Sequence, residues 1–434
     1  MRSASIWTEY APSASEPWNL RRVVHLHRRA GFGACAAELE RDLGDGPGAT
    51  LTRFLEGKRT VGAPASFTTT SQLLSDGAVA GNDPARLKAW WLWRMLVSPD
   101  PLGERLALLW HDHFATSQLK VMDLAAMLRQ NELLRRHGRA PFAELCRNVV
   151  KDAALLVWLD AQSNRKEHPN ENLARELMEL FTLGEGNYGE RDVKEVARAL
   201  TGLSVSAEQR VHFAAKNHDD GEKTILGRTE RFDADGVLAH LVAQPATATH
   251  LARRLCALFL REELASAEVV ASLAAELRAH ELDLGHAVAL VLRSRLFFSA
   301  ANLGGVVAAP VPWLIGAARA LELLDPAPRT LLLAEWSARL GQDLFYPPTV
   351  FGWDGGRAWI TTGALLGRAR FAQELVGGAL TPVGVDPLAA LRRRGAPERE
   401  LARVLLGDES FAAGSGDPAQ LVARLLASPA AQLA

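Results

Sequence analysis

The chain has 434 residues, of which 48% are hydrophobic and 23% are charged, a balance that is typical of a folded globular protein and excludes a largely disordered one. Its 49 basic and 50 acidic residues give a formal net charge of −1, so no overall field attracts nucleic acid or an anionic membrane surface. The three cysteines, Cys35, Cys146 and Cys256, are far apart and form no CxxC pair, which argues against a disulfide framework or a zinc ribbon.

Residues 1–24 form the N-terminal extension that we expect ahead of the main body. They hold no continuous apolar run and are interrupted by Glu9, Pro12 and Glu16, which argues against a secretory signal peptide. No later stretch is apolar and uncharged over the length that a membrane span needs. As written, the sequence therefore predicts a cytoplasmic protein without a membrane span.

Helical periodicity dominates the rest of the chain, because apolar residues recur at three- and four-residue spacing. Gly138 and Gly202 close two of the periodic stretches, as glycines often do after a helix, and Pro141 suits the start of another. The Ser-, Thr- and Gly-rich stretch 60–83 breaks the pattern and predicts a flexible loop. The expected helices include residues 84–98, 102–115, 121–138, 141–160, 190–202, 246–263, 267–282 and 284–298.

Two regions depart from this periodicity. Residues 203–232 are polar, contain the turn signal "DDG" and alternate over short segments, which predicts a small insertion resembling a β-hairpin. Residues 341–360 combine prolines and glycines with Phe351, Trp353 and Trp359, and aromatic side chains this dense predict an ordered loop pinned by them. The sequence thus predicts a mainly α fold, a multi-helix globular bundle with minor β structure.

The stretch "NENLARELMELF", residues 170–181, places two carboxylates one helical turn apart. If Asn170 caps a helix here, apolar side chains cover most of its circumference and leave a polar strip of roughly 100°. Such a narrow strip is expected to line a cleft or an internal polar network. Glu176 and Glu179 are candidates for a cation-chelating or acid–base pair, with Arg175 to orient a carboxylate or an anionic substrate. Asn170 and Asn172 are candidates for substrate or network contacts.

The same residues also have a purely structural interpretation. Glu171 with Arg175, and Arg175 with Glu179, have the spacing of ordinary ion pairs on a helix surface. Residue types and spacing alone leave both interpretations open.

A second candidate is "WHDHF", residues 110–114. His111 and His113 have a spacing that suits two metal ligands on a strand, but on a helix they point about 200° apart unless the helix ends there. The alternative is that His113 is a core histidine, hydrogen-bonded across a helix contact.

A third candidate is the stretch "NHDDGEK", residues 217–223. His218 and Asp219 are suitable ligands for a hard or borderline metal in a loop, and Lys223 is a candidate for substrate or network contacts. The same letters also suit a plain turn, and an EF-hand is excluded because no Glu closes such a loop.

Several signatures of known enzymes are absent. The chain has no GxSxG elbow, no P-loop, no HExxH and no GxGxxG that opens a helix after a strand, so serine hydrolases, phosphate-loop enzymes, zincins and dinucleotide enzymes are disfavoured.

Five blocks occur in order along the chain, and together they resemble a bacterial family called domain of unknown function 1800. The blocks are "HLHRRAGFGA", "ERLALLWHDHFATSQLKV", "LDAQSNRKEHPNENLARELMELFTLGEGNYGERDVKEVARALTGLSV", "HDDGEKTILG" and "GQDLFYPPTVFGWDGGRAWI". They run from His25 to about Phe371. We expect a family domain at about 25–380, which includes the insertion 203–232, followed by C-terminal helices at 381–434.

The resemblance implies a largely helical protein and brings no reaction with it. Members are often encoded beside proteins that resemble the sulfatase and alkaline phosphatase fold, which implies a partner of that kind, and many members look exported. Two positions depart from the family's pattern. Phe181 stands where some members have His, which removes a potential ligand, and Gly189 stands where a Thr or Ser cap is common.

Two hypotheses follow. The first is a metal- or carboxylate-dependent hydrolytic enzyme whose polar site lies between helices. Glu176, Glu179 and Arg175 would be its catalytic groups, and a divalent metal would be its cofactor, with ligands drawn from His111, His113, His218 and Asp219. The second is a non-catalytic helical scaffold or partner protein for a neighbouring gene product, in which Arg175 pairs fully with Glu176 or Glu179. A nucleic-acid binder is disfavoured, because the charge is balanced and no known motif is present.

Overall fold

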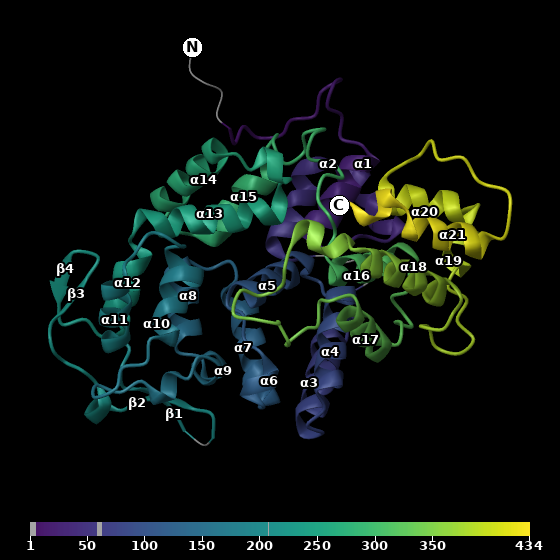
Figure 1. Cartoon of the computed structure of the whole chain (residues 1–434). Helices are drawn as coiled ribbons and strands as arrows, with labels where there is room; N and C mark the ends of the chain where they lie inside the picture. The colour runs from purple at the N-terminus through teal and green to yellow at the C-terminus, as the bar shows by residue number, and fades with distance from the viewer. Residues whose placement is uncertain (1–5, 59–62, 207) are drawn as a thin grey trace, which may run out of the picture.

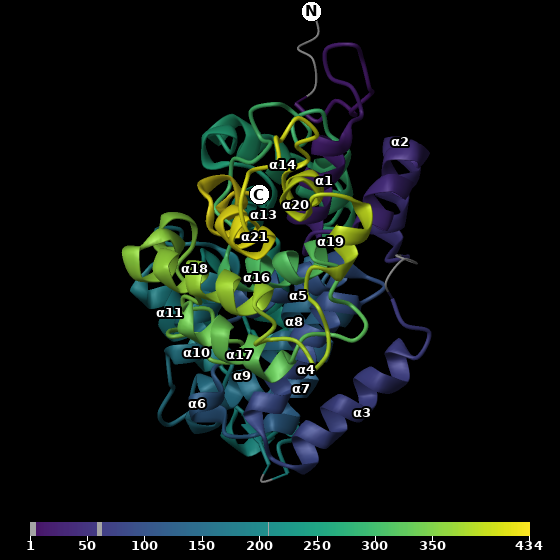
Figure 2. The same cartoon turned by 90° about the vertical axis from the view of Figure 1, so that its right-hand side faces the viewer.

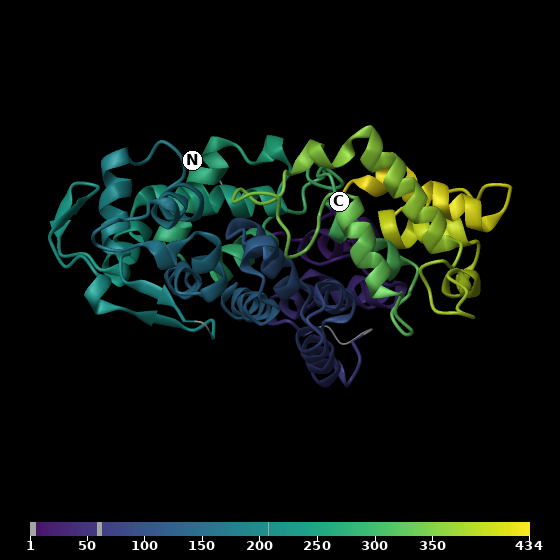
Figure 3. The same cartoon turned by 60° about the horizontal axis from the view of Figure 1, so that its bottom comes forward.

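The computed structural model describes residues 6–58, 63–206 and 208–434. Within these ranges, 21 α-helices and four short strands form an elongated body, seen from the side in Figures 1 and 3 and from one end in Figure 2, which confirms the mainly α prediction. The strands β3 and β4 lie at one end of this body and α19, α20 and α21 at the other. Among the described helices, none combines the length and the apolar character that crossing a membrane requires.

The first half of the chain supplies helices to the middle of the molecule and to the end that carries β3 and β4 (Figure 1). They are α1 (Leu20–Ala30), α2 (Ala36–Glu56), α3 (Phe67–Ala80), α4 (Pro84–Val97), α5 (Pro101–His113), α6 (Gln118–Val121), α7 (Leu124–His137), α8 (Phe142–Val150), α9 (Ala153–Trp158), α10 (Asn172–Glu176) and α11 (Glu190–Ala199).

The helices of the second half extend the body to both ends. They are α12 (Ala234–Val242), α13 (Pro245–Phe259), α14 (Ala267–Ala279), α15 (Leu284–Arg293), α16 (Pro310–Ala320), α17 (Thr330–Arg339), α18 (Thr362–Val376), α19 (Ala389–Arg394), α20 (Pro397–Leu406) and α21 (Pro418–Ala427).

The insertion 203–232 forms two small antiparallel sheets, as the alternating pattern predicts. Strand β1 (Leu203–Val205) pairs with β2 (Val211–Phe213), and β3 (Lys223–Ile225) pairs with β4 (Arg228–Glu230). The region is therefore a pair of hairpins at one edge of the helical body (Figure 1).

Two hydrophobic cores fill the molecule, and the helices α1 and α5 contribute to both. Within α5, Leu106 belongs to the first core and Leu108 to the second, because side chains two positions apart on a helix face different directions. The indole rings of Trp18 and Trp158 are half-buried and pack against both cores. The two cores thus share a common wall.

The prediction of a flexible loop at residues 60–83 is wrong for most of this stretch, because residues 67–80 form α3. Residues 60–62 lie outside the described ranges. The Oγ atom of Ser71 accepts from Trp90 Nε1 at 3.0 Å and from Arg94 Nη1 at 2.7 Å. The ring of Phe67 stacks on Trp93 with centroids 5.3 Å apart. Tertiary contacts with α4 therefore override the low helix propensity of this stretch.

The loop 341–360 is ordered, with one correction. Trp353 and Trp359 are buried, as expected, but the Phe351 side chain is 66% exposed and does not pin the loop. Residues Gly356–Ile360 form a 3₁₀ turn that leads into α18.

A buried carboxylate fastens α4, α5 and α7 to one another. The carboxylate is that of Glu104, in the first turn of α5, which Asp100 caps by accepting from Gly103 N at 2.8 Å. One oxygen of Glu104 accepts from Arg94 Nε and from Arg135 Nε at 2.9 Å each. Trp91 Nε1 donates to its other oxygen at 3.1 Å. Burial disfavours the charged form, but the two guanidinium groups outweigh it and hold the pKa of Glu104 below its usual range.

We predict that Glu104→Ala lowers the free energy of unfolding by about 3–5 kcal/mol, because it leaves two guanidinium groups buried without their carboxylate. Chemical denaturation measures this loss. Glu132→Ala is the control, because Glu132 is a more exposed partner of Arg135 and its removal should cost less than about 1 kcal/mol. Equal losses in the two variants would contradict a central role for Glu104.

Candidate functional site

The Asn-Glu-Asn segment begins its helix one residue later than a cap at Asn170 predicts. The α10 helix starts at Asn172 with Glu171 as its N-cap, and the Asn170 side chain still accepts from Asn172 N at 2.9 Å, the bond expected of a capping asparagine. The Asn170 amide nitrogen also donates to Ser163 Oγ at 2.8 Å. Asn170 thus belongs to a local hydrogen-bond network, and Asn172 is exposed.

After Glu176 the helix widens into a π-helical turn over Leu177–Thr182. Leu183 N donates to Met178 O at 2.8 Å, a bond across five residues. Two imidazoles then take up successive main-chain carbonyls of this turn. His250 Nε2 donates to Leu180 O at 2.8 Å, and His113 Nε2 donates to Phe181 O at 3.1 Å. Turns of this type occur often at functional sites.

Arg175 is paired, although with partners other than the neighbouring carboxylates of the strip. Its guanidinium contacts Glu171 Oε2 at 3.0 Å and Glu190 Oε1 at 2.8 Å. The expected ion pair with Glu171 is therefore present, whereas Arg175 forms no ion pair with Glu176 or Glu179 within the described residues. The charge of Arg175 is largely used outside this carboxylate pair.

The two carboxylates of the strip have different surroundings. Glu179 Oε2 accepts from Tyr188 Oη at 2.5 Å, whereas no donor in the described part of the chain forms a hydrogen bond with the half-buried Glu176 side chain. Burial raises the pKa of Glu176, and the neighbouring charge of Glu179 raises it further. Burial and the bond to Glu179 also raise the pKa of Tyr188, so this hydroxyl remains a donor.

The segment "WHDHF" ends α5, and its three polar residues face three different partners. His111 Nε2 accepts from Phe345 N at 3.3 Å, and its ring packs edge-on to Trp91. The Asp112 carboxylate accepts from Trp353 N at 2.8 Å and pairs with Arg254 at 2.7 Å. Both histidines lie in the protein interior.

Burial keeps these imidazoles neutral. It lowers the pKa of His111 to about 3 and that of His113 well below its usual value, with Arg254 as a smaller cause for His113. The Nε2 atom of each histidine is hydrogen-bonded to a main-chain group, that of His111 to Phe345 N and that of His113 to Phe181 O. The two histidines therefore connect α5 to the loop 341–360 and to the π-helical turn.

The stretch "NHDDGEK" forms a turn that α11 holds in place. His218 Nδ1 donates to Thr201 O at 2.9 Å, and Asp219 pairs with Arg198 at 2.7 Å. This guanidinium lowers the pKa of Asp219. Lys223 is buried, and its Nζ donates to the carbonyl oxygens of Asp219 and Gly221 at 2.5 and 2.9 Å.

The structure thus brings Glu176 and Glu179 together with Tyr188, and it places the predicted metal ligands elsewhere. Across residues 6–58, 63–206 and 208–434, one group of three His, Cys, Asp or Glu side chains has ligand atoms all within 4.8 Å of one another, and it contains none of the predicted ligands. Each of the four predicted ligands is instead bonded to a main-chain group or to Arg198. These ligands are His111, His113, His218 and Asp219.

The two positions that depart from the family's pattern are both accommodated. The Phe181 ring is buried between Phe114 and His113, with centroids 5.1 and 6.1 Å away. Gly189 is the N-cap of α11, where its N–H donates to Asp192 Oδ2 at 2.9 Å.

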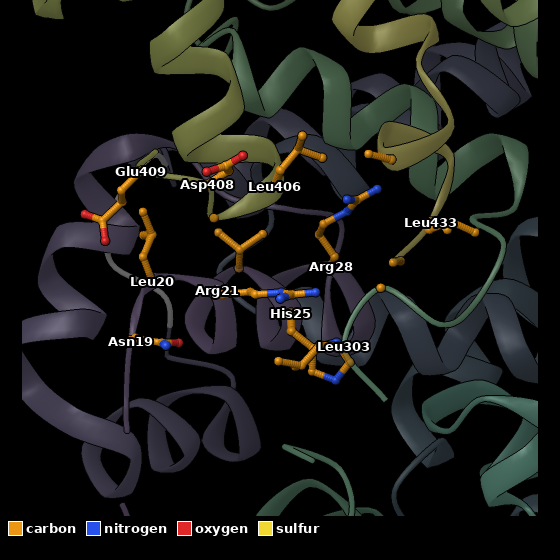
Figure 4. Close-up of a pocket in the computed structure, with 15 residues that line it drawn as sticks. Asn19, Leu20, Arg21, His25, Arg28, Leu303, Leu406, Asp408, Glu409 and Leu433 are labelled. Carbon is orange, nitrogen blue, oxygen red and sulfur yellow. The ribbon is translucent and has the colours of Figure 1, made fainter. Parts of the chain in front are cut away.

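A polar cavity of about 630 Å³ beside α1 is a feature that the sequence did not reveal. Arg21, His25 and Arg28 contribute to it from α1, and Asp408 and Glu409 from the segment after α20 (Figure 4). Arg21, His25 and Arg28 are spaced by four and three residues, and this spacing could have predicted from the sequence that they share one face of a helix.

Within this cavity wall, the buried His25 is one hydrogen bond short. Its Nε2 donates to Phe297 O at 3.1 Å, while Nδ1 has no partner among the described residues. Burial, with Arg29 as a smaller cause, holds the pKa of His25 well below its usual value, so the ring is neutral. Arg28 donates to Leu405 O and Ala431 O at 3.1 and 2.9 Å.

The sequence model of one family, described as "Protein of unknown function (DUF1800)", matches residues 25–433. The match continues through the C-terminal helices beyond residue 380. No curated protein and no solved structure matches the chain.

We predict that Gly352→Ala disrupts the contact between α5 and the loop 341–360. Gly352 has φ +82°, and an added Cβ would lie 2.2 Å from Asp112 Oδ1 and 2.7 Å from Asp112 O. The combined backbone strain and overlap should cost about 3 kcal/mol of unfolding free energy.

Gly341→Ala is the matched control for this experiment. Gly341 also has a positive φ, of +93°, but its nearest atom would be Trp359 Cζ3 at 3.4 Å. Its substitution should therefore cost only the backbone term of about 1–2 kcal/mol. Thermal or denaturant unfolding compares the two, and a smaller loss for Gly352→Ala would refute the proposed close contact.

Proposed function

Because the chain belongs to the DUF1800 family, whose description names no reaction, we propose a function from the geometry of its most unusual polar pair. We infer that the protein is a carboxylate-dependent hydrolytic enzyme in which Glu176 and Glu179 are the acid–base couple. The observation that carries the proposal is the contrast between the unpaired Glu176 and the adjacent Glu179, which Tyr188 holds.

The scaffold hypothesis expects this pair to be neutralised by Arg175, and the ion pairs of Arg175 do not support that expectation. Its partners are Glu171 and Glu190. Two carboxylates on adjacent turns without a shared cation repel each other, and this repulsion adds to the burial that raises the pKa of Glu176. Neighbouring acids whose surroundings separate their pKa values are a recurrent arrangement in catalytic acid–base pairs.

In the proposed reaction, Glu179 is the base and Glu176 is the acid. Glu179, oriented by the Tyr188 hydroxyl, takes a proton from water, and the water oxygen bonds to the electrophilic centre of the substrate. Glu176 gives its proton to the leaving group as the bond to that group breaks. A divalent cation held between the two carboxylates is a variant of the same proposal, and a chelator separates the two because it abolishes only metal-dependent turnover.

We predict that Glu176→Gln reduces hydrolysis by at least about 100-fold while leaving the fold at least as stable as before. Because the folded state raises the pKa of Glu176, protonation of this group stabilises the fold fully below the unfolded pKa of about 4.3, and that stabilisation is lost as pH rises through the folded pKa. Glu176→Gln should therefore be about 0.5 kcal/mol more stable than the native chain at pH 7. Turnover of chromogenic esters, phosphates and glycosides and unfolding at pH 4 and pH 7 give the two readouts.

Two control variants keep this experiment specific. Glu171→Gln breaks an ion pair with Arg175 and should lose about 0.3–0.5 kcal/mol at pH 7, in the opposite direction. Glu185→Gln changes an exposed acid on the following loop and should leave turnover unchanged. Native turnover that survives in both Glu176→Gln and Glu179→Gln would rule out the proposed couple.

A second candidate function, a partner protein, rests on a separate observation. Large apolar side chains are exposed along the aromatic loop and the start of α18, a concentration that often marks a binding surface. They are Phe351 at 66%, Ile360 at 38%, Leu365 at 42% and Leu366 at 68%. We propose this segment as the contact surface for a neighbouring gene product, of the kind that the family resemblance implies.

If this surface binds that product, the double variant Phe351→Ser, Leu366→Ser should weaken co-purification at least about tenfold, because both side chains lose apolar contact area. The double variant Leu73→Ser, Leu74→Ser is the control, since these exposed leucines lie on α3. Equal capture by the native chain and both variants would count against the surface.

A further inference from the structure

A cluster of three ligand-type side chains lies where α14 is followed by α15. Glu276 is in the last turn of α14, His280 directly follows that helix, and His286 is in the first turn of α15. One ligand atom from each side chain lies within 4.8 Å of the other two. The cluster is separate from the carboxylate pair of α10 and from the α1 cavity.

The turn between the helices holds the cluster in place through an unusual backbone. Glu281 and Leu282 have φ values of +52° and +58°, a left-handed conformation that non-glycine residues seldom adopt. The buried Leu282 donates its N–H to Leu277 O at 2.7 Å. Asp283 then caps α15 by accepting from His286 N at 2.8 Å, and the His286 ring stacks on that of His280, the residue that follows α14.

The same turn is fastened to the entrance of α8, which gives it a rigid base. Phe142 N donates to Leu282 O at 3.0 Å, and Gly285 N donates to Arg139 O at 3.1 Å. Arg139 is itself paired with Asp100 at 2.6 Å. Ligands that project from a firmly held turn are partly preorganised for a metal ion, which reduces the cost of binding.

The two imidazoles lie against each other beside the Glu276 carboxylate. Their rings stack with centroids 3.7 Å apart at 22°, and His286 Nε2, a buried atom 3.9 Å from Glu276 Oε2, has no hydrogen-bond partner among the described residues. His280 Nδ1 lies 3.8 Å from Glu276 Oε2 and donates to the main-chain oxygen of Glu276 at 3.0 Å, so the ring has to turn to present Nε2 to an ion. Such a bond fixes the tautomer of a metal-binding histidine and leaves its other nitrogen with the lone pair.

We propose that Glu276, His280 and His286 form a binding site for a divalent transition metal of the zinc class. Two imidazoles and one carboxylate favour zinc over magnesium or calcium, which prefer oxygen ligands. Ligand atoms about 2.1 Å from a tetrahedral zinc lie about 3.4 Å apart, so the two stacked imidazoles turn about their side-chain bonds to close the cluster around the ion. Because the chain supplies three ligands and the cluster is half exposed, water completes the coordination and the fourth position is open to a ligand.

Zinc titration of the full-length, untagged protein after treatment with a chelator tests the proposal by calorimetry. We expect one zinc ion per chain, no comparable binding of magnesium, and affinity at least tenfold lower in His280→Ala, in His286→Ala and in Glu276→Gln. The last variant keeps the size and polarity of the side chain, so loss of zinc binding there does not reflect misfolding. Cobalt absorption bands typical of tetrahedral coordination should appear in the native chain and vanish in the histidine variants.

His137→Ala is the matched control, because His137 also pairs with a carboxylate, Glu144 at 2.8 Å, and is not part of the cluster. It should bind zinc as the native chain does, and so should Glu176→Gln with Glu179→Gln, which separates this site from the proposed function. Failure to bind zinc, or binding that the His280, His286 and Glu276 substitutions leave unchanged, would overturn the proposal.

Discussion

The hydrogen bonds of three consecutive residues at the end of α5 fix the positions of parts of the chain that are far apart in sequence. His111 accepts a hydrogen bond from the main-chain N–H of Phe345, and Asp112 accepts one from the main-chain N–H of Trp353. Asp112 also forms an ion pair with Arg254, and His113 donates to the main-chain oxygen of Phe181 in the π-helical turn. Buried polar groups must be paired, since an unsatisfied donor or acceptor costs about 1–3 kcal/mol. The segment therefore joins α5 to the loop 341–360, to α13 and to the helix that carries the carboxylates. Its histidines contribute to the architecture that holds the proposed catalytic couple, and the proposal assigns them no part in the chemistry.

This arrangement explains why the π-helical turn and the carboxylate pair occur together. His113 and His250 bind successive carbonyls at the end of the turn, so these carbonyls have partners outside the helix. The wider turn follows Glu176 and includes Glu179, while Tyr188 returns from the next loop to hold Glu179. Arg175 is drawn toward Glu190 at the start of α11. The couple is thus shaped by contacts from α5, α11 and α13 as much as by its own helix.

Helical periodicity predicted most of the helices, and turn signals, short alternation and dense aromatic residues predicted the hairpin-like insertion and the ordered loop, because all of these are local features of the sequence. It could not predict α3, whose stability comes from Trp90, Trp93 and Arg94 on a different helix. It also treated residues 170–181 as a regular helix, because only the distant imidazoles reveal the π-helical turn. The polar strip singled out Glu176 and Glu179 as candidates, but it gave no indication that Tyr188, which follows residues 170–181, bonds to Glu179. The cluster of Glu276, His280 and His286 depends on two left-handed residues in a turn, and their side chains give no sign of that conformation.

The wall shared by the two cores has a thermodynamic consequence. Melting either core would strip apolar contacts from one face of α1 and α5 and from the indoles of Trp18 and Trp158, which also support the other core. Neither core can therefore unfold without weakening the other. Many chains of this length, by contrast, divide into domains that fold independently. The molecule should lose its structure as a single cooperative unit, and damage in one core is transmitted to the other through those helices.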